Sequence, residues 1–265
     1  MERYVRFNNG NKICFGLVKG DIVAELIGEE LSDFKESGIE HDLSSLKLLA
    51  PCNPTKAVCV GLNYKDTVLE PGAQWPKEPL LFIKPSTSIT NPGDDIIKWA
   101  MTEDLAFEAE LAIVIGKKAH LVPEEEAHEY IWGYTIANDV TAKDLQRADI
   151  LWARSKSFDT FLPLGPWIVS GIDAHHLMIT SSVNGQQKQK GTTADLIFGI
   201  EYLVSFVSHI TTLLPGDIIL TGTPGGYGSS LDVNDKVEIE ISEIGKLMNT
   251  CKVSSERWSL APRHK

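Results

Sequence analysis

Two glutamates on one predicted strand are the residues of this sequence whose spacing points most directly to chemistry. In AFEAELAIVIGKK (106–118), strand alternation places Glu108 and Glu110 on one face, whereas the opposite face is wholly apolar. Two neighbouring carboxylates repel each other and lose hydration when buried, so their charge needs compensation. The hard cations Mg²⁺, Mn²⁺ and Ca²⁺ prefer carboxylate oxygens, so the pair indicates a metal site. The alternative is an edge strand whose polar face is solvated at one end.

Other polar residues can be interpreted in more than one way. Asp139 ends the apolar, strand-like segment 132–140, where it would suit a third metal ligand, but it would equally suit the cap of a helix predicted over 141–149. Lys156 lies beside aromatic and proline residues, which is typical of a surface lysine whose stem packs on apolar groups. The loop TGTPGGYG (221–228) offers backbone N–H groups and hydroxyls, yet it fits no phosphate-binding pattern and is typical of a turn.

Charge and composition exclude several classes of protein. The 265 residues carry a formal net charge of −11 and no cluster of Lys and Arg, which argues against a nucleic-acid partner. An acidic protein that handles anions needs local positive charge from a metal or from well-placed lysines. No apolar run approaches the roughly 20 residues that cross a bilayer. The first ten residues lack the apolar region of a signal peptide, so we expect a cytoplasmic protein with no membrane contact.

Cysteine and histidine spacing excludes further kinds of site. The four cysteines are scattered, which predicts reduced and mostly buried thiols. The histidines show no H-E-x-x-H spacing, which argues against a zinc site. No G-x-S-x-G element is present to indicate a serine hydrolase.

The elements needed to position these residues divide the chain into two parts. Residues 1–50 are expected to form a small N-terminal module of short strands, and residues 51–265 a catalytic domain. Strands do not alternate regularly with helices, so we expect a strand-rich α+β fold, not a doubly wound sheet. In the catalytic domain, strands are predicted over 56–62, 80–86, 106–118, 132–140, 217–224 and 236–242, and helices over 123–131, 141–149 and 192–210.

Six segments, taken together and in order, resemble the fumarylacetoacetate hydrolase family, which includes acylpyruvate hydrolases, oxaloacetate decarboxylases and the isomerase/decarboxylases of homoprotocatechuate breakdown. The resemblance covers about residues 50–250. It implies a mixed β-roll core with surrounding helices, as in the C-terminal domain of that family, and a homodimer. The segments are VGLNYKDTVLE (60–70), LFIKPSTSI (81–89), FEAELAIVIGKKA (107–119), GYTIANDVTAKDLQ (133–146), SKSFDTFLPLGPWIV (155–169) and PGDIILTGTPGG (215–226).

The resemblance also implies roles for individual residues. A Mg²⁺ or Mn²⁺ ion would be held by an E-x-E pair and a later aspartate, and a lysine would contact the substrate carboxylate or the developing anion. A glutamine and a threonine would contact the substrate. The matching positions are Glu108, Glu110 and Asp139 for the metal, Lys156 for the anion, and Gln146 and Thr223 for the substrate.

Two positions depart from the family pattern. The N-Y-x-D-H-x-x-E segment usually carries a His–Glu dyad, but here Glu70 is paired with Thr67 at the histidine position. A threonine hydroxyl has no useful basicity near neutral pH, so activation of water by this dyad is in doubt. Lys143 stands where many members have arginine; it keeps the charge but loses the bidentate fork.

These residues predict a divalent-metal-dependent enzyme that acts on a small, unsaturated 2-oxo acid or diacid. The metal would chelate the substrate and stabilise an enolate, with Glu70 as proton shuttle and Lys156 and Lys143 as anion contacts. Because Thr67 replaces the partner of Glu70, decarboxylation or isomerisation is favoured. The alternatives are C–C bond hydrolysis of an acylpyruvate- or fumarylacetoacetate-like substrate, and a metal-binding relative with little catalysis.

Overall fold

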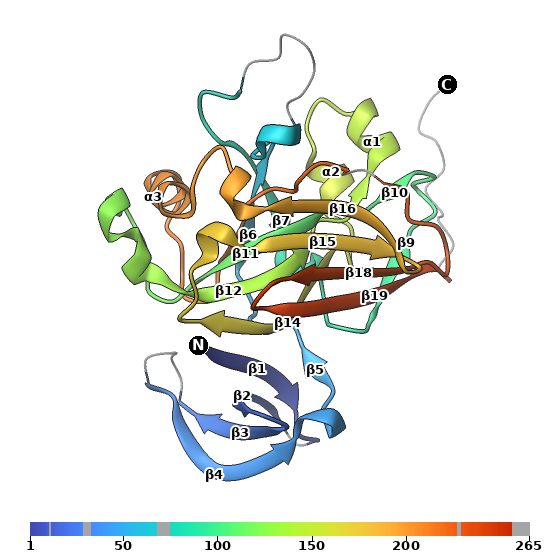
Figure 1. Cartoon of the computed structure of the whole chain (residues 1–265). Helices are drawn as coiled ribbons and strands as arrows, with labels where there is room; N and C mark the ends of the chain where they lie inside the picture. Colours follow the sequence, from blue (N-terminus) through green and yellow to red (C-terminus); the bar gives the residue numbers. More distant parts are fainter. Residues whose placement is uncertain (11, 29–32, 68–74, 227–228, 256–265) are drawn as a thin grey trace.

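The computed structural model describes residues 1–10, 12–28, 33–67, 75–226 and 229–255 (Figure 1). They form the expected strand-rich α+β fold, in which two mixed sheets dominate and helices are few. Most neighbouring strands are antiparallel, but β6 and β17 pair in parallel, as do β8 with β14 and β9 with β19. Each strand predicted in the catalytic domain overlaps a strand of the structure, so these predictions are confirmed in outline.

The larger sheet has 12 strands. In spatial order they are β4 (Lys35–Asp42), β3 (Ile22–Ile27), β2 (Ile13–Lys19), β1 (Glu2–Asn8), β14 (Leu162–Ser170), β12 (Ile131–Asn138), β11 (Ala109–Ile115), β17 (Ile218–Leu220), β6 (Lys56–Gly61) and β7 (Leu80–Pro85), with β5 (Leu48–Leu49) beside β1 and β8 (Ile89–Thr90) beside β14.

The second sheet has five strands, and a two-stranded sheet lies apart from it. The five are β16 (Gln186–Thr192), β15 (Met178–Val183), β18 (Lys236–Ile241), β19 (Gly245–Val253) and β9 (Asp95–Lys98); the two are β10 (Leu105–Ala106) and β13 (Thr141–Ala142). The α-helices are α1 (Lys143–Ala148), α2 (Ala153–Lys156) and α3 (Ile200–Ile210), and the 3₁₀ helices are η2 (Leu43–Ser45), η3 (Lys65–Thr67), η4 (Ser86–Ser88), η5 (Glu124–Tyr130), η6 (Ala174–His176) and η7 (Thr193–Asp195).

The N-terminal strands β1–β5 form the lower part of the molecule in Figure 1. They have a small apolar core that includes Val5, Phe7 and Val23. Strand β1 also pairs with β14, with Tyr4 opposite Ile168, so these strands extend the larger sheet. The boundary proposed after residue 50 stays a prediction.

Strand β11 lies at the centre of the molecule and is buried along its whole length. One face packs Leu111 and Ile113 into the main core, together with side chains of the second sheet such as Ile239. The other face places Ala112 and Val114 in a second apolar cluster. A strand that is covered on both sides holds its first residues in fixed positions, and the two glutamates lie at that end.

The helix predicted over 192–210 is wrong in its first half. Thr192 caps only the short turn η7, and α3 begins at Ile200. Asn63 explains the break, because its carbonyl accepts from Ile197 N at 2.8 Å and its Oδ1 accepts from Phe198 N at 2.8 Å. These tertiary hydrogen bonds hold the backbone of 197–198 outside the helix. The helix predicted over 123–131 is the 3₁₀ helix η5, preceded by Pro123.

Two other predictions can be compared with the fold. All four cysteines are unpaired and buried, as predicted. In the part of the chain that the structure describes, no helix is long and apolar enough to cross a membrane.

Asp217 connects the segment before β6 to the turn before β17. Its fully buried carboxylate accepts hydrogen bonds from Thr55 N at 2.8 Å, Thr55 Oγ1 at 2.7 Å and Leu214 N at 2.9 Å, and pairs with Lys56 Nζ at 2.5 Å. Burial alone would raise the pKa of Asp217, but the hydrogen bonds from Lys56, Leu214 and Thr55 outweigh it and lower the pKa below its ordinary value.

Replacing Asp217 with asparagine should therefore destabilise the protein by about 3 kcal/mol at pH 7, because it breaks a buried ion pair. A carboxylate with a lowered pKa stabilises the fold above its unfolded pKa and loses that contribution as pH falls through the folded pKa. The difference between wild type and Asp217→Asn should thus shrink below about pH 4. Urea unfolding at pH 7 and at lower pH measures this difference in the free energy of unfolding. Asp21→Asn, at an exposed position, is the control. An equal effect of both variants would contradict this role of Asp217.

Candidate active site

Three carboxylates from two neighbouring strands meet at one point. Glu108 directly precedes β11, Glu110 lies within it, and Asp139 directly follows β12. Ala109 is paired with Asn138 across these antiparallel strands, and Asp139 N donates to Glu108 O at 2.9 Å. One oxygen of each side chain lies within 4.8 Å of those of the other two. All three are buried, so the solvated-edge alternative for the glutamates is wrong.

Asp139 does not cap the helix that follows it. The residue at the cap position of α1 is Ala142, and no side chain caps that helix. The Asp139 carboxylate is instead bonded to Lys84 Nζ at 2.6 Å and to Lys156 Nζ. Of the two alternatives that the sequence left open, the structure supports placement with the two glutamates.

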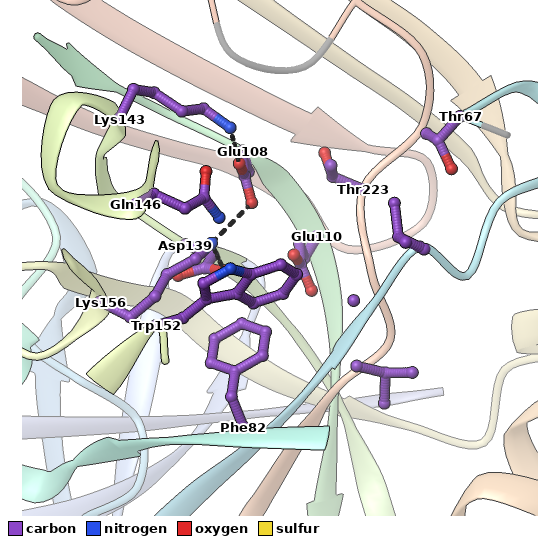
Figure 2. Close-up of a pocket in the computed structure, with 13 residues that line it drawn as sticks. Thr67, Phe82, Glu108, Glu110, Asp139, Lys143, Gln146, Trp152, Lys156 and Thr223 are labelled. Carbon is purple, nitrogen blue, oxygen red and sulfur yellow. Dashed lines mark hydrogen bonds and ion pairs between the residues drawn. The ribbon is translucent and has the colours of Figure 1, made fainter. Parts of the chain in front are cut away.

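Three lysines surround the carboxylates. Lys156 Nζ bonds Glu108 Oε2 at 2.9 Å as well as Asp139, and Lys143 Nζ bonds Glu108 Oε1 at 2.9 Å (Figure 2). Lys84, the third lysine, forms an ion pair with Asp139. Lys156 is only 2% exposed, so its interpretation as a surface lysine is wrong. The formal charges of the three carboxylates and three ammonium groups cancel.

The pKa values of the two lysines bonded to Asp139 shift in opposite directions, although burial acts to lower both. Burial lowers the pKa of Lys84. Burial also acts to lower the pKa of Lys156, but the charges of Asp139 and Glu108 outweigh it and raise that pKa above its ordinary value. In the metal-free protein Lys156 therefore favours its charged form near neutral pH, which suits it to contacting an anion better than to acting as a base.

Glu110 is the carboxylate that lacks a cation. Its Oε2 accepts from Gly222 N at 2.7 Å. Among the described residues, no lysine or arginine forms an ion pair with it. Burial raises the pKa of Glu110 well above its ordinary value, and the charges of Asp139 and Glu108 raise it further. A buried carboxylate without a cation is unfavourable unless one is supplied, so the donor set fits a divalent cation with three oxygen ligands.

A cavity of about 250 Å³ opens beside these groups. Figure 2 shows the side chains around it, which come from segments far apart in the sequence, between residues 60 and 223. Thr67 borders it, whereas Glu70 lies outside the described residues. The structure thus brings together every other site residue expected from the sequence. The polar lining residues are Thr67, Glu108, Glu110, Asp139, Lys143, Gln146, Lys156 and Thr223.

The apolar wall of the cavity was not expected from the sequence. Phe82 and Trp152 pack edge to face, with their ring centroids 5.5 Å apart, and Lys156 Nζ lies 4.9 Å from the centre of the Phe82 ring. A Cβ on Gly61 would lie 2.9 Å from Trp152 Cζ3, so glycine is required for the indole to lie there. Lys84 was also missed, because a lysine in an apolar strand carries no signal that identifies its partner.

The TGTP segment continues the pairing with β11 through the backbone N–H of Thr221, which donates to Leu111 O at 3.0 Å, and through two threonine side chains. Beyond β17, Thr221 Oγ1 donates to Leu111 O at 3.0 Å and Thr223 Oγ1 donates to Ala109 O at 2.9 Å. Gly222 between them has a φ of +96°, which favours glycine, and directs its N–H to Glu110. The segment is therefore part of the site as well as a turn.

Comparison with known proteins identifies the family. The model of the fumarylacetoacetate (FAA) hydrolase C-terminal domain matches residues 56–252, which is most of the chain. The chain belongs to the fumarylacetoacetate hydrolase family. A second family model, described as Rv2993c-like N-terminal, matches residues 2–51.

Relatives within the fumarylacetoacetate hydrolase family are enzymes of several kinds. The mitochondrial oxaloacetate tautomerase fahd2 of Xenopus laevis is 42% identical over 218 residues, covering 78% of this chain and 68% of the relative. The crystal structure of 2-hydroxyhepta-2,4-diene-1,7-dioate isomerase from Mycobacterium marinum has a TM-score of 0.90 and 36% identity, covering 97% of this chain and 100% of that one.

A more distant structure contains both a metal and a keto acid. Maleylpyruvate hydrolase from Sphingobium sp. SYK-6, in complex with manganese(II) and pyruvate, has a TM-score of 0.78 and 26% identity, covering 96% of this chain and 100% of that one. The fumarylacetoacetate hydrolase family thus includes metal-binding members, and this chain carries an acidic cluster that could hold a metal ion.

Proposed function

We propose that the chain is a divalent-metal-dependent isomerase that interconverts the keto and enol forms of a small 2-oxo diacid such as oxaloacetate. The neighbouring isomerase and the oxaloacetate tautomerase support this reaction class. Decarboxylation of a related diacid is the other favoured reaction, because the release of CO₂ leaves an enolate of the product that the cation would stabilise in the same way.

The charge balance of the cavity carries the proposal. With all three carboxylates ionised, as metal ligands must be, their formal charges cancel those of the three ammonium groups. Addition of a divalent cation would leave a net charge of +2 in a largely buried site. A 2-oxo diacid is a dianion at neutral pH, so it would offset the charge of these described groups more fully than a monoanion would. A cavity of about 250 Å³ also suits a small substrate.

Glu108, Glu110 and Asp139 would hold the cation, with Mg²⁺ or Mn²⁺ matching their oxygen donors. When bound, the cation supplies positive charge that stabilises a developing enolate. Lys156 and Lys143 add fixed positive charge at the cavity wall for the same anion. Gln146 would orient a carboxylate of the substrate, and Glu70 would move the proton between carbon and oxygen. Apolar Phe82 and Trp152 would keep water from the reacting carbon.

A panel of 2-oxo acids, assayed with Mg²⁺ and with Mn²⁺, tests this function. We expect keto–enol interconversion of oxaloacetate, followed through the ultraviolet absorbance of the enol, to exceed any hydrolysis of an acylpyruvate. Faster acylpyruvate hydrolysis would overturn the preference. Absence of turnover for every substrate, with metal binding intact, would favour a metal-binding relative with little catalysis.

Hydrolysis is the second candidate, supported by the maleylpyruvate hydrolase neighbour. Thr67 borders the cavity, but its hydroxyl donates to Tyr64 O at 2.7 Å and has no useful basicity. Replacing Thr67 with histidine should therefore raise acylpyruvate hydrolysis by about tenfold or more, because it supplies a general base. Thr67→Val is the matched control. Equal hydrolysis by both variants would show that this position does not decide the reaction.

The homodimer expected from the family resemblance stays a prediction. Light scattering of the purified protein measures the mass directly, and a monomer at micromolar concentration would contradict it.

A further inference from the structure

Gln189 is a buried glutamine of β16 whose amide orientation is fixed by the backbone. Its Oε1 accepts from Ala109 N at 3.1 Å, and its Nε2 donates to Pro224 O at 3.1 Å. A backbone N–H can only donate and a carbonyl can only accept, so the amide cannot be reversed. The side chain is 1% exposed, and Ser181 Oγ donates to its Oε1 at 3.0 Å as well.

The orientation of the Gln189 amide determines which group the Thr223 hydroxyl donates to and which it accepts from. Gln189 Nε2 donates to Thr223 Oγ1 at 2.8 Å, and the single proton of Thr223 is directed to Ala109 O at 2.9 Å. Thr223 also borders the cavity beside Glu110. With its proton already committed, its oxygen can offer the cavity only a lone pair.

We propose that Thr223 accepts a hydrogen bond from the enol hydroxyl of the substrate, and that Gln189 is the positioning residue that fixes this polarity. The inference rests on the proposed function, because it takes a 2-oxo acid as the ligand. The keto form presents only acceptor oxygens to Thr223, which repel its lone pair. The enol form presents an O–H group, which Thr223 can accept. The site therefore recognises the enol tautomer at this position.

The alternative arrangement is disfavoured by the same network. For Thr223 to donate to a keto or carboxylate oxygen, its proton would have to leave Ala109 O. Gln189 Nε2 would still occupy one lone pair of the hydroxyl. Ala109 is fully buried, so the abandoned carbonyl would have no access to water.

Two small ligands separate these arrangements without any turnover. Glycolate carries a hydroxyl next to its carboxylate, whereas oxalate has acceptor oxygens only. Their dissociation constants are measured by calorimetry on the Mn²⁺-loaded protein, for wild type, Thr223→Val, Thr223→Ser and Gln189→Met. We expect Thr223→Val to weaken glycolate by about tenfold, the value of one hydrogen bond, and to change oxalate by less than about twofold. Thr223→Ser should retain the wild-type ratio of the two constants.

Gln189→Met provides the second measurement, because it removes the amide and frees the Thr223 hydroxyl to rotate. The preference for glycolate over oxalate, relative to wild type, should fall in this variant. If Thr223→Val no longer binds Mn²⁺, the ratio of the glycolate and oxalate dissociation constants in Gln189→Met decides whether the inference holds. Equal weakening of both ligands by Thr223→Val, or an unchanged ratio in Gln189→Met, would overturn the role of Thr223 and leave the proposed function standing. Failure of both ligands to bind the Mn²⁺-loaded wild type would overturn the proposed function, and this inference with it.

Discussion

Replacing Glu110 with glutamine should weaken Mn²⁺ binding by about 100-fold or more, while leaving the metal-free protein at least as stable as wild type. The glutamine can still accept the hydrogen bond from Gly222 N, because only one carboxylate oxygen is used. The substitution removes a buried carboxyl group whose ionised form has no ion-pair partner among the described residues. Loss of an unpaired buried charge is neutral or stabilising, whereas loss of a ligand is costly for the cation.

Glu108→Ala is the informative comparison for this prediction. It too should lose the metal and leave the fold standing, but it removes the partner of Lys143 and Lys156. The metal-free variant should therefore unfold more readily than Glu110→Gln, by about 3 kcal/mol. Calorimetric titration with Mn²⁺ and urea unfolding without metal measure both effects. Full metal stoichiometry in either variant would refute the ligand assignment.

Replacing Lys156 with methionine should reduce kcat by about 10²–10³-fold. Methionine has a similar length but supplies no positive charge for the developing anion. Lysine ordinarily titrates well above pH 8, so the wild type is expected to keep this charge throughout the neutral range, and the loss should not vary between about pH 6 and pH 8. The variant also leaves Glu108 and Asp139 with one ammonium partner fewer.

Lys117→Met, at a lysine that is 64% exposed, is the control for the Lys156 variant and should retain wild-type kcat. Metal content is measured in parallel, because a variant that no longer binds Mn²⁺ would lose activity for another reason. A Lys156→Met protein that binds metal and retains kcat within about threefold would contradict an electrostatic role for this lysine.

Local pattern was sufficient for the parts of the site that lie on one strand or at its end. Alternation alone placed Glu108 and Glu110 on a common face, because the side-chain period of a strand is fixed. The apolar run before Asp139 located that carboxylate at a strand terminus. Family resemblance was needed to decide whether Asp139 caps the following helix or joins the two glutamates as a metal ligand, since both roles suit an aspartate at that position.

Groups that depend on strand order could not be predicted. Lys84 is 55 residues from Asp139 in sequence and belongs to an edge strand of the same sheet. Gln189, in the second sheet, is bonded to Ala109 and to Thr223 at the cavity wall, and the packing of that sheet against β11 leaves no periodic signal in β16. The start of α3 was predicted wrongly for the same reason. Asn63, from a distant part of the sequence, binds the backbone of 197–198 and keeps it outside the helix.

The attachment of Ala109 has a consequence for ion selectivity. Ala109 lies between the two glutamates, its N–H bonded to Gln189 and its carbonyl to Thr223. These bonds fix the main chain from which both glutamate side chains extend. Mg²⁺ requires oxygens at about 2.0–2.1 Å, whereas Ca²⁺ takes them at about 2.3–2.6 Å and in greater number. If the glutamates hold a cation there, we expect the smaller Mg²⁺ to bind more tightly than Ca²⁺.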